Sequence, residues 1–313
     1  MALVLHQKKL MVSLPRLITG LVTISSLSCH AQFNDYTDHY VNNEGVNIHY
    51  VSRGDGPTLV FLHGFPDFWF TWKYQMDQLS KDYNVIGIDL RAYNQSEGPS
   101  ETDGYQMTKL MSDILVVIKD VGNDQVTLIG NDWGGAIAWQ IATYYPNQVN
   151  GLIACNIPHP KSLSNYLNAH PETADYTKKN ESPHAIDYWN IERLMDTSGA
   201  VDQKLSSAYM DAFERSNIQG MLNYYKASYP KPSQVTGNNI TLERKIKCPV
   251  LMLHGMKDSA FPPGTLNDHW LWIKNSFTLH TFPDAGHFIQ REAPERVLYH
   301  IQQWLKVNVK KAK

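Results

Sequence analysis

The chain has 313 residues, with 28 Lys and Arg against 30 Asp and Glu, and a formal net charge of −2. This length can bury a substantial core, either as one large domain or as a core with one inserted cap. The charge is balanced and no long basic run or stripe is visible, which argues against a nucleic-acid partner.

The first 31 residues are typical of an export signal. Basic residues precede a short apolar stretch at 17–27, and small residues around Ala31 predict cleavage directly after it. Met11 is an alternative start, since Arg16 would then supply the charge ahead of the apolar stretch. That stretch is too short and too rich in hydroxyl groups for a membrane span. We therefore expect an exported protein, periplasmic or secreted, without a membrane span after signal removal; the alternative is an ordinary N-terminal helix.

Two cysteines remain after this cleavage, Cys155 and Cys248. Cys155 ends one predicted strand, and Cys248 precedes another, "PVLMLHG". If these strands are parallel neighbours, the two cysteines lie at opposite ends, separated by roughly five residues at about 3.3 Å each. This exceeds the limit of about 7 Å between Cα atoms in a disulfide. We predict no disulfide, despite the exported context.

From about Asp38 the chain alternates strand-like and helix-like segments. "TLVFLHG" is a continuous apolar run, typical of a strand buried on both faces of a parallel sheet. Strand patterns also occur in "VNIHYVSRG", "NVIGIDL", "QVTLIGN", "GLIACN", "PVLMLHG" and "FTLHTFP". Helical spacing of apolar residues predicts helices in "MSDILVVIKDVG" and, behind Pro294, near the C-terminus. The alternation predicts an α/β fold with a mostly parallel, doubly wound sheet.

One region breaks this alternation. From about Pro158 to Pro232 there is no buried-strand pattern, only helix-like and loop segments rich in Tyr, Asn, His and Ser. We interpret 158–232 as an inserted helical cap between two parts of the core, 32–157 and 233–313. The oligomeric state stays open, a homo-oligomer included.

Four polar loops follow predicted strands. They are "HGFP" after Leu62, "NDWGG" around Asp132, "GMKD" ending at Asp258, and "DAGH" ending at His287. Because ligands of open α/β sheets bind beyond the carboxyl ends of the strands, all four loops open onto the same edge. Taken singly, each of these loops has residue types that are common in ordinary turns. Together they supply, in chain order, a nucleophile, an acid and a histidine, which predicts a catalytic site.

These segments resemble the α/β-hydrolase fold family over essentially all of the mature sequence. "FLHGFPDFWFTW", "DLRAYNQSEGP", "IGNDWGG", "NYYKA", "LHGMKDSAFPP" and "DAGHF" are similar to the epoxide hydrolase branch. The combination is specific, whereas "HGFP" or "DWGG" alone would be shared with haloalkane dehalogenases. The resemblance implies the α/β-hydrolase fold, an apolar epoxide as the small-molecule substrate, and neither a metal nor an organic cofactor.

The catalytic roles follow from the residue types. Asp132 takes the serine position of the nucleophile elbow G-x-S-x-G. A carboxylate is ionised at neutral pH, so it can displace at a saturated carbon without a base and form an ester. His287 would then activate water to hydrolyse that ester, with Asp258 holding the imidazole in the right tautomer.

An oxyanion hole is expected beside the nucleophile. The backbone N–H groups of Phe65 and Trp133 would stabilise the tetrahedral intermediate. The resemblance also implies a cis peptide before Pro66, which would aim the Phe65 amide inward. Phe65, Pro66 and Trp133 are expected to line the substrate site as well. His63 in the same loop is expected to be a structural hydrogen-bonder, and His159 a loop or rim residue.

The resemblance further implies two cap tyrosines that hydrogen-bond the epoxide oxygen, because an alkoxide leaves poorly without a proton. "MLNYYKA" places one of them at Tyr225 rather than Tyr224. Aligning "SPHA" with the usual Ser-Pro-x-Ala segment places the other at Tyr176, with Tyr188 as the alternative.

Two other functions stay open. A hydrolase of the haloalkane dehalogenase type would use the same triad, with Trp133 as a halide donor. "HGFP" lacks the asparagine that many of those enzymes carry where Phe65 stands, and Tyr225 is better explained by an epoxide. A non-catalytic small-ligand-binding protein on this fold is the other alternative, although it would not require an intact triad. The chain departs from the pattern at Asn131, where histidine is common, and at Ala92 and Asn94, where glycines are usual.

Overall fold

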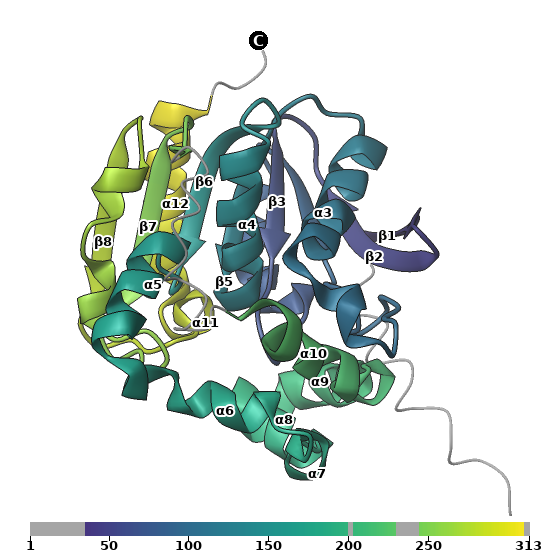
Figure 1. Ribbon diagram of the computed structural model, residues 1–313. Coiled ribbons are helices and arrows are strands. Elements are labelled where there is room, and N and C mark those ends of the chain that lie inside the picture. Colours follow the sequence, from purple (N-terminus) through teal and green to yellow (C-terminus); the bar gives the residue numbers. More distant parts are fainter. Residues whose placement is uncertain (1–34, 200–202, 230–243, 310–313) are drawn as a thin grey trace, which may run out of the picture. The chain divides into compact units, whose positions relative to one another are not determined.

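The computed structural model describes residues 35–199, 203–229 and 244–309 (Figure 1). The predicted export signal at 1–31 lies outside these residues, so export stays a prediction. Within the described ranges, no helix is long and apolar enough to cross a membrane.

The described residues form an eight-stranded sheet of order β1-β2-β4-β3-β5-β6-β7-β8. The pairs β1–β2 and β2–β4 are antiparallel, and all the others are parallel. The mostly parallel α/β sheet predicted from the sequence is therefore confirmed. The strands are β1 (Thr37–Asn43), β2 (Val46–Arg53), β3 (Thr58–Leu62), β4 (Asn84–Ile88), β5 (Val126–Asn131), β6 (Val149–Cys155), β7 (Val250–Gly255) and β8 (Phe277–Phe282).

Strand β1 was not predicted, because its sequence "TDHYVNN" is polar. It is the edge strand, and most of its side chains are exposed or half-buried. Polar side chains on an edge strand discourage pairing with other molecules, and they also remove the apolar pattern by which a strand is recognised.

Helices cover both faces of the sheet. In Figure 1, α3 (Met107–Val121) and α4 (Asp132–Tyr144) lie in front of the strands, and α12 (Pro294–Asn308) lies behind them. Helix α12 begins at Pro294, as predicted, and packs against α2 (Lys73–Leu79). Proline is well suited to the first position of a helix because its missing N–H has no helical acceptor there.

A group of helices lies between β6 and β7 in the chain, as expected for an inserted cap. In Figure 1 these helices, shown in teal and green, gather at the carboxyl ends of the parallel strands. The boundaries of the cap at 158–232 stay an interpretation. The helices are α5 (Pro160–Ala169), α6 (Asp175–Glu181), α7 (Ala185–Tyr188), α8 (Ile191–Ser198), α9 (Gln203–Arg215) and α10 (Ile218–Ser228).

The cap rests on the unusual loop that follows β4. Ala92 has φ 72° and Asn94 has φ 47°, so both adopt the left-handed conformation that glycine normally supplies. Asn94 was expected to tolerate it. Ala92 is held in place because its carbonyl accepts from the N–H of Asn217, directly before α10. A Cβ added at Gly220 of α10 would approach the Ala92 methyl to 2.5 Å, so this glycine makes room for the substituted loop.

The absence of a Cys155–Cys248 disulfide is confirmed. Both cysteines are free and buried. Strands β6 and β7 are parallel neighbours in which Cys155 lies opposite Leu253, five residues beyond Cys248. Exposure to an oxidising compartment cannot join them without moving a strand.

The turn from β5 to α4 leaves no space for a side chain at Gly130 or Gly134. A Cβ added at Gly130 would lie 2.6 Å from the Gly135 backbone, and one at Gly134 would meet the backbones of Leu62 and His63. Strand β3, strand β5 and helix α4 are therefore in direct backbone contact at the point where Asp132 begins the helix.

Gly134→Ala should accordingly lower the free energy of unfolding by about 3 kcal/mol, the upper end of the range for overpacking, because backbone atoms cannot move aside. Gly122→Ala is the control, since it has a positive φ of 76° but nothing within 4 Å of an added Cβ. It should cost only about 1 kcal/mol of backbone strain. Urea denaturation of both variants checks this, and equal costs would contradict the steric account.

Candidate active site

Asp132 lies at the sharpest point of the β5–α4 turn, with φ 50°. A non-glycine residue in this conformation is strained, and such strain concentrates at functional sites. The preceding residue, Asn131, donates from Nδ2 to the carbonyls of Cys155 (3.0 Å) and His287 (3.2 Å). Asparagine in place of the usual histidine therefore ties the elbow to β6 and to the loop that carries His287.

The three predicted triad residues come together from three different loops. His287 Nε2 lies 3.6 Å from Asp132 Oδ2, and His287 Nδ1 lies 2.9 Å from Asp258 Oδ2. The shorter distance is a hydrogen bond and the longer one is not. The imidazole is thus oriented by Asp258 and presents its other nitrogen to Asp132.

Asp258 is buried and all its partners favour the ionised form. Oδ1 accepts from the N–H groups of Ala260 (2.8 Å) and Phe261 (3.0 Å), and Oδ2 accepts from Asn156 Nδ2 (2.7 Å) as well as facing His287. Burial raises the pKa of Asp258, but the charge of His287 and these hydrogen bonds outweigh it and hold the pKa below its ordinary value. Asp258 is therefore ionised at neutral pH.

The imidazole lies between two carboxylates. Burial lowers the pKa of His287, but the charge of Asp258, the hydrogen bond to Asp258 and the nearby charge of Asp132 outweigh it and raise the pKa to about 10. At neutral pH His287 is therefore charged in the free protein.

The predicted cis peptide joins Phe65 and Pro66. The Phe65 N–H donates to Asp132 Oδ1 at 2.9 Å. Trp133 is the second residue of α4, so its N–H belongs to the first turn, where backbone N–H groups have no helical acceptor. Both proposed oxyanion-hole donors are thus adjacent to the carboxylate.

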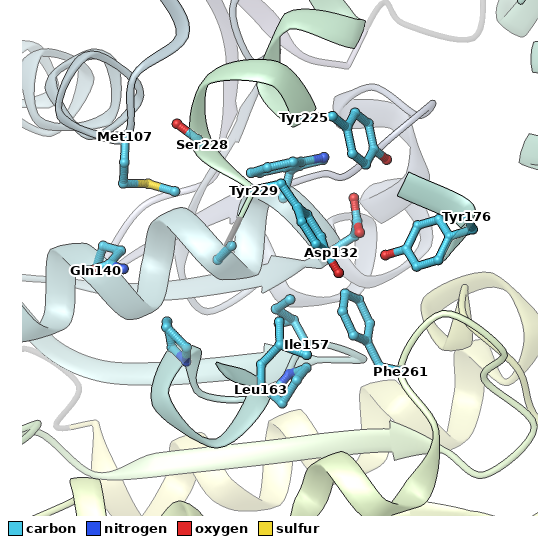
Figure 2. Close-up of a pocket in the computed structure, with 14 residues that line it drawn as sticks. Met107, Asp132, Gln140, Ile157, Leu163, Tyr176, Tyr225, Ser228, Tyr229 and Phe261 are labelled. Atoms are coloured by element: carbon cyan, nitrogen blue, oxygen red, sulfur yellow. The ribbon is translucent and has the colours of Figure 1, made fainter. Parts of the chain in front are cut away.

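A pocket opens over Asp132 between the core and the cap (Figure 2). Its lining is predominantly apolar and aromatic. The lining residues are Met107, Asp132, Trp133, Ala136, Gln140, Ile157, Pro158, Pro160, Leu163, Tyr176, Tyr225, Ser228, Tyr229 and Phe261.

Not every residue expected to line the site does so. Trp133 lines this pocket, whereas Phe65 and Pro66 are not among the lining residues. The rings of Trp189 and Tyr225 pack edge-on against the Phe65 ring, at centroid distances of 4.8 and 5.6 Å, and cover it. Phe65 therefore reaches the site through its backbone N–H, not its ring.

The structure separates the alternative cap tyrosines. Figure 2 shows the hydroxyl groups of Tyr176 and Tyr225 directed toward the Asp132 carboxylate. Tyr188 is 41% exposed, with the Arg193 guanidinium 4.1 Å from its ring centroid, and is not a lining residue. Tyr224 is buried outside the pocket lining and donates to a backbone carbonyl at 2.9 Å.

Both pocket tyrosines are strongly held in the protonated form. Burial is the main cause, and the negative charge of Asp132 adds to it, so the pKa of Tyr225 and that of Tyr176 lie well above the ordinary value. Hydrogen bonds from Trp133 and Asn180 act in the opposite direction on Tyr225. A phenol that cannot ionise at neutral pH is available as a hydrogen-bond donor to a ligand oxygen.

Sequence reasoning missed several residues of the site. Tyr229 follows Tyr225 by four residues, one helical turn, and lines the same pocket, with its ring centroid 6.4 Å from that of Tyr176. That spacing was a usable signal. Asn156 and Asn180 carried none, because each acts on a residue distant in the chain: Asn156 on Asp258, and Asn180 on Tyr225.

Two histidines near the site have structural roles. His63 Nδ1 lies 2.9 Å from the Gly64 carbonyl and its Nε2 accepts from the Leu90 N–H, which confirms it as a structural hydrogen-bonder. His159 was predicted as a loop or rim residue, but it is buried and its Nδ1 accepts from the Lys161 N–H at the start of α5. In the part of the chain that the structure describes, no three His, Cys, Asp or Glu residues are placed to hold a metal ion.

Several known proteins are similar to this chain in sequence. A family model for the alpha/beta hydrolase fold matches residues 57–294. Epoxide hydrolase 3 of Xenopus tropicalis is 29% identical over 290 residues, covering 85% of this chain and 76% of the relative. Epoxide hydrolase 4 of Homo sapiens is 28% identical over 295 residues, covering 87% and 79%.

This chain is also similar in fold to a solved structure of an epoxide hydrolase. The crystal structure of a Bacillus megaterium epoxide hydrolase in complex with an inhibitor superimposes with a TM-score of 0.79 at 31% identity. The match covers 86% of this chain and 100% of that one. The chain therefore belongs to the α/β-hydrolase fold family and, within it, to the epoxide hydrolase branch.

Proposed function

We propose that this protein hydrolyses an epoxide to a vicinal diol through a covalent ester on Asp132. One observation carries the proposal: two neutral phenols and a charged imidazole face a single elbow carboxylate. Tyr176 and Tyr225 point toward Asp132 across the pocket, and His287 Nε2 lies 3.6 Å from it (Figure 2). Asp132 would thus be the nucleophile, the two tyrosines would donate a proton to the leaving oxygen, and His287 would be the base of the following step.

In the first step an Asp132 carboxylate oxygen attacks an epoxide carbon. A new C–O bond forms, the epoxide C–O bond breaks, and the epoxide oxygen takes a proton from Tyr225 or Tyr176. Because burial keeps both phenols protonated, either can donate. Their raised pKa values also lie closer to the pKa of the alcohol that the epoxide oxygen becomes. The charged His287 then returns a proton to the phenolate and becomes neutral.

Ester formation itself prepares the second step. It removes the charge of Asp132, which is one of the causes that raise the pKa of His287. The neutral imidazole takes a proton from water, and the hydroxide attacks the ester carbonyl. The Phe65 and Trp133 N–H groups hold the resulting oxyanion. Collapse breaks the ester C–O bond, and the departing alkoxide takes the second proton of the attacking water, so that the diol is released with Asp132 ionised and His287 charged as at the start.

The lining residues indicate the substrate class. Apart from Asp132 and the tyrosine hydroxyls, the walls are mostly aromatic and aliphatic, among them Trp133, Ile157, Leu163 and Phe261. An apolar pocket with a few convergent polar groups binds an apolar molecule with one polar end. We therefore propose an apolar epoxide, with its oxygen at the tyrosines.

Asp132→Asn should abolish diol formation from styrene oxide, and Tyr225→Phe should reduce it about 10²-fold, because a positioned proton donor contributes about that much. Tyr224→Phe is a matched control, since it removes a neighbouring buried hydroxyl that bonds only a backbone carbonyl. It should retain the wild-type rate. Chromatographic measurement of the diol checks all three.

The same variants are assayed for bromide release from a bromoalkane. Bromide release that survives Tyr225→Phe, with no diol from any epoxide tried, would establish a dehalogenase instead. Inactivity toward both substrates, combined with tight binding of a small ligand, would establish a non-catalytic binding protein.

His287→Gln should accumulate the Asp132 ester, since the first step is retained and water is no longer activated. Mass spectrometry of the intact protein after a single turnover should show the mass of enzyme plus epoxide. No adduct in that experiment would refute the two-step mechanism.

His287 should also make stability depend on pH. Its folded pKa of about 10 exceeds the ordinary 6.5, so the folded protein binds a proton that the unfolded chain releases above pH 6.5. This stabilisation is complete below pH 6.5 and is lost as the pH rises toward 10. Urea denaturation should show the advantage of wild type over His287→Gln shrinking across this window.

The Asp132→Asn variant, which removes the charge as the ester does, should lower the pKa of His287 in an NMR titration. An unchanged pKa would contradict the proposed preparation of the base.

A further inference from the structure

Asp67, Tyr209 and Arg291 meet beneath the cap although they come from three distant segments. We call them the loop–cap cluster. Asp67 directly follows the Phe65–Pro66 peptide, Tyr209 lies in α9, and Arg291 lies in α11 (Ile289–Glu292), four residues beyond His287. None of the three lines the pocket.

The cluster is closed by a contact along each side. The Tyr209 hydroxyl donates to Asp67 Oδ1 at 2.9 Å, Arg291 Nη2 lies 3.3 Å from Asp67 Oδ2, and Arg291 Nη1 donates to the Tyr209 oxygen at 3.3 Å. Asp67 and Tyr209 are each 1% exposed. Removing one member of a buried charged group leaves the others without compensation, so the three residues hold one another in place.

On one side the cluster contacts the loop that contains the Phe65 N–H. The Asp67 N–H donates to the Gly64 carbonyl at 2.8 Å, and Asp67 Oδ1 also accepts from the Phe68 N–H at 3.0 Å. These bonds close the turn that contains the Phe65 N–H. A shift of the Asp67 carboxylate would therefore move that donor.

On the other side the cluster reaches the segment that carries the base. The Arg291 guanidinium lies 4.7 Å from the Phe288 ring centroid, and the Phe288 and His287 rings are 4.9 Å apart. The neighbouring Gln290 donates to Asn131 Oδ1 at 3.3 Å, and Asn131 in turn holds the His287 carbonyl. Arg291 is thus anchored between the cap and the residues around the base.

We propose that Asp67, Tyr209 and Arg291 are positioning residues for hydrolysis of the ester, which they serve by holding the Phe65 N–H and the His287 ring at a fixed distance. This inference rests on the proposed function. The second step needs both groups at once, because negative charge develops at the N–H while the imidazole takes a proton. The first step needs the N–H only to orient a carboxylate that is already charged.

Tyr209→Phe removes one hydroxyl and keeps the ring that packs against Phe68 and Phe70. Ester hydrolysis should slow about tenfold, while ester formation stays within about twofold, because small misplacements are costly where two groups must act together. The value of kcat and that of KM should then fall together, leaving kcat/KM near wild type, since kcat/KM reports only the first step. Mass spectrometry should detect the ester during steady-state turnover of Tyr209→Phe.

Tyr50→Phe is the matched control. Its hydroxyl donates to Asp120 Oδ2 at 2.6 Å, also a Tyr–Asp pair, but on β2 and outside the pocket lining. This variant should lose stability without accumulating ester. Arg291→Met should behave as Tyr209→Phe does, and Arg291→Lys, which keeps the charge, should restore part of the hydrolysis rate. The Arg291 pair also supplies the comparison if Tyr209→Phe does not fold.

The inference is overturned if Tyr209→Phe and Arg291→Met lower kcat and kcat/KM by the same factor, or behave no differently from Tyr50→Phe. A wild-type protein that forms neither ester nor diol would refute the proposed function, and the positioning role would fall with it. Diol formation by wild type with unaltered ester hydrolysis in both variants would refute the positioning role alone.

Discussion

One imidazole held between two carboxylates is the constraint on which the rest of the site depends. Asp258, buried and hydrogen-bonded by two N–H groups and by Asn156, cannot be neutralised at moderate pH, so His287 is oriented and charged. Asp132, in the β5–α4 turn, is the second of the two carboxylates. Under the proposed mechanism the protonation of His287 follows the state of Asp132, because the proposed ester on Asp132 would remove one of the two negative charges.

The turn can direct Asp132 toward His287 only because glycines occupy the positions around it where strand and helix backbones meet. The backbones of β3, β5 and α4 lie in contact at Gly130 and Gly134, which forces the turn and gives Asp132 its positive φ. The same closeness brings the Phe65 N–H onto the carboxylate. The positions of the proposed nucleophile and of one proposed oxyanion-hole donor therefore both follow from one packing constraint.

Much of this was predictable from the sequence, because strands, elbow and loop residues each carry a local pattern. The apolar runs predicted every parallel strand, and "GNDWGG", "GMKD" and "DAGH" identified the residues that converge. Edge strand β1 escaped because an exposed polar strand has no such pattern. Asn156 escaped because its role is a hydrogen bond to a side chain 102 positions away, which no neighbouring residue reveals.

The sequence by itself thus determined the α/β architecture, the residues proposed as nucleophile, acid and base, and the absence of a Cys155–Cys248 disulfide, since all of these follow from short segments and strand order. Only the tertiary structure decided which cap tyrosines face the carboxylate, that Phe65 contributes its backbone while its ring is covered, and that Asp67, Tyr209 and Arg291 form a cluster. The reason is physical: the cap helices lack a sheet register, so the direction of each side chain depends on how the helices pack over the core.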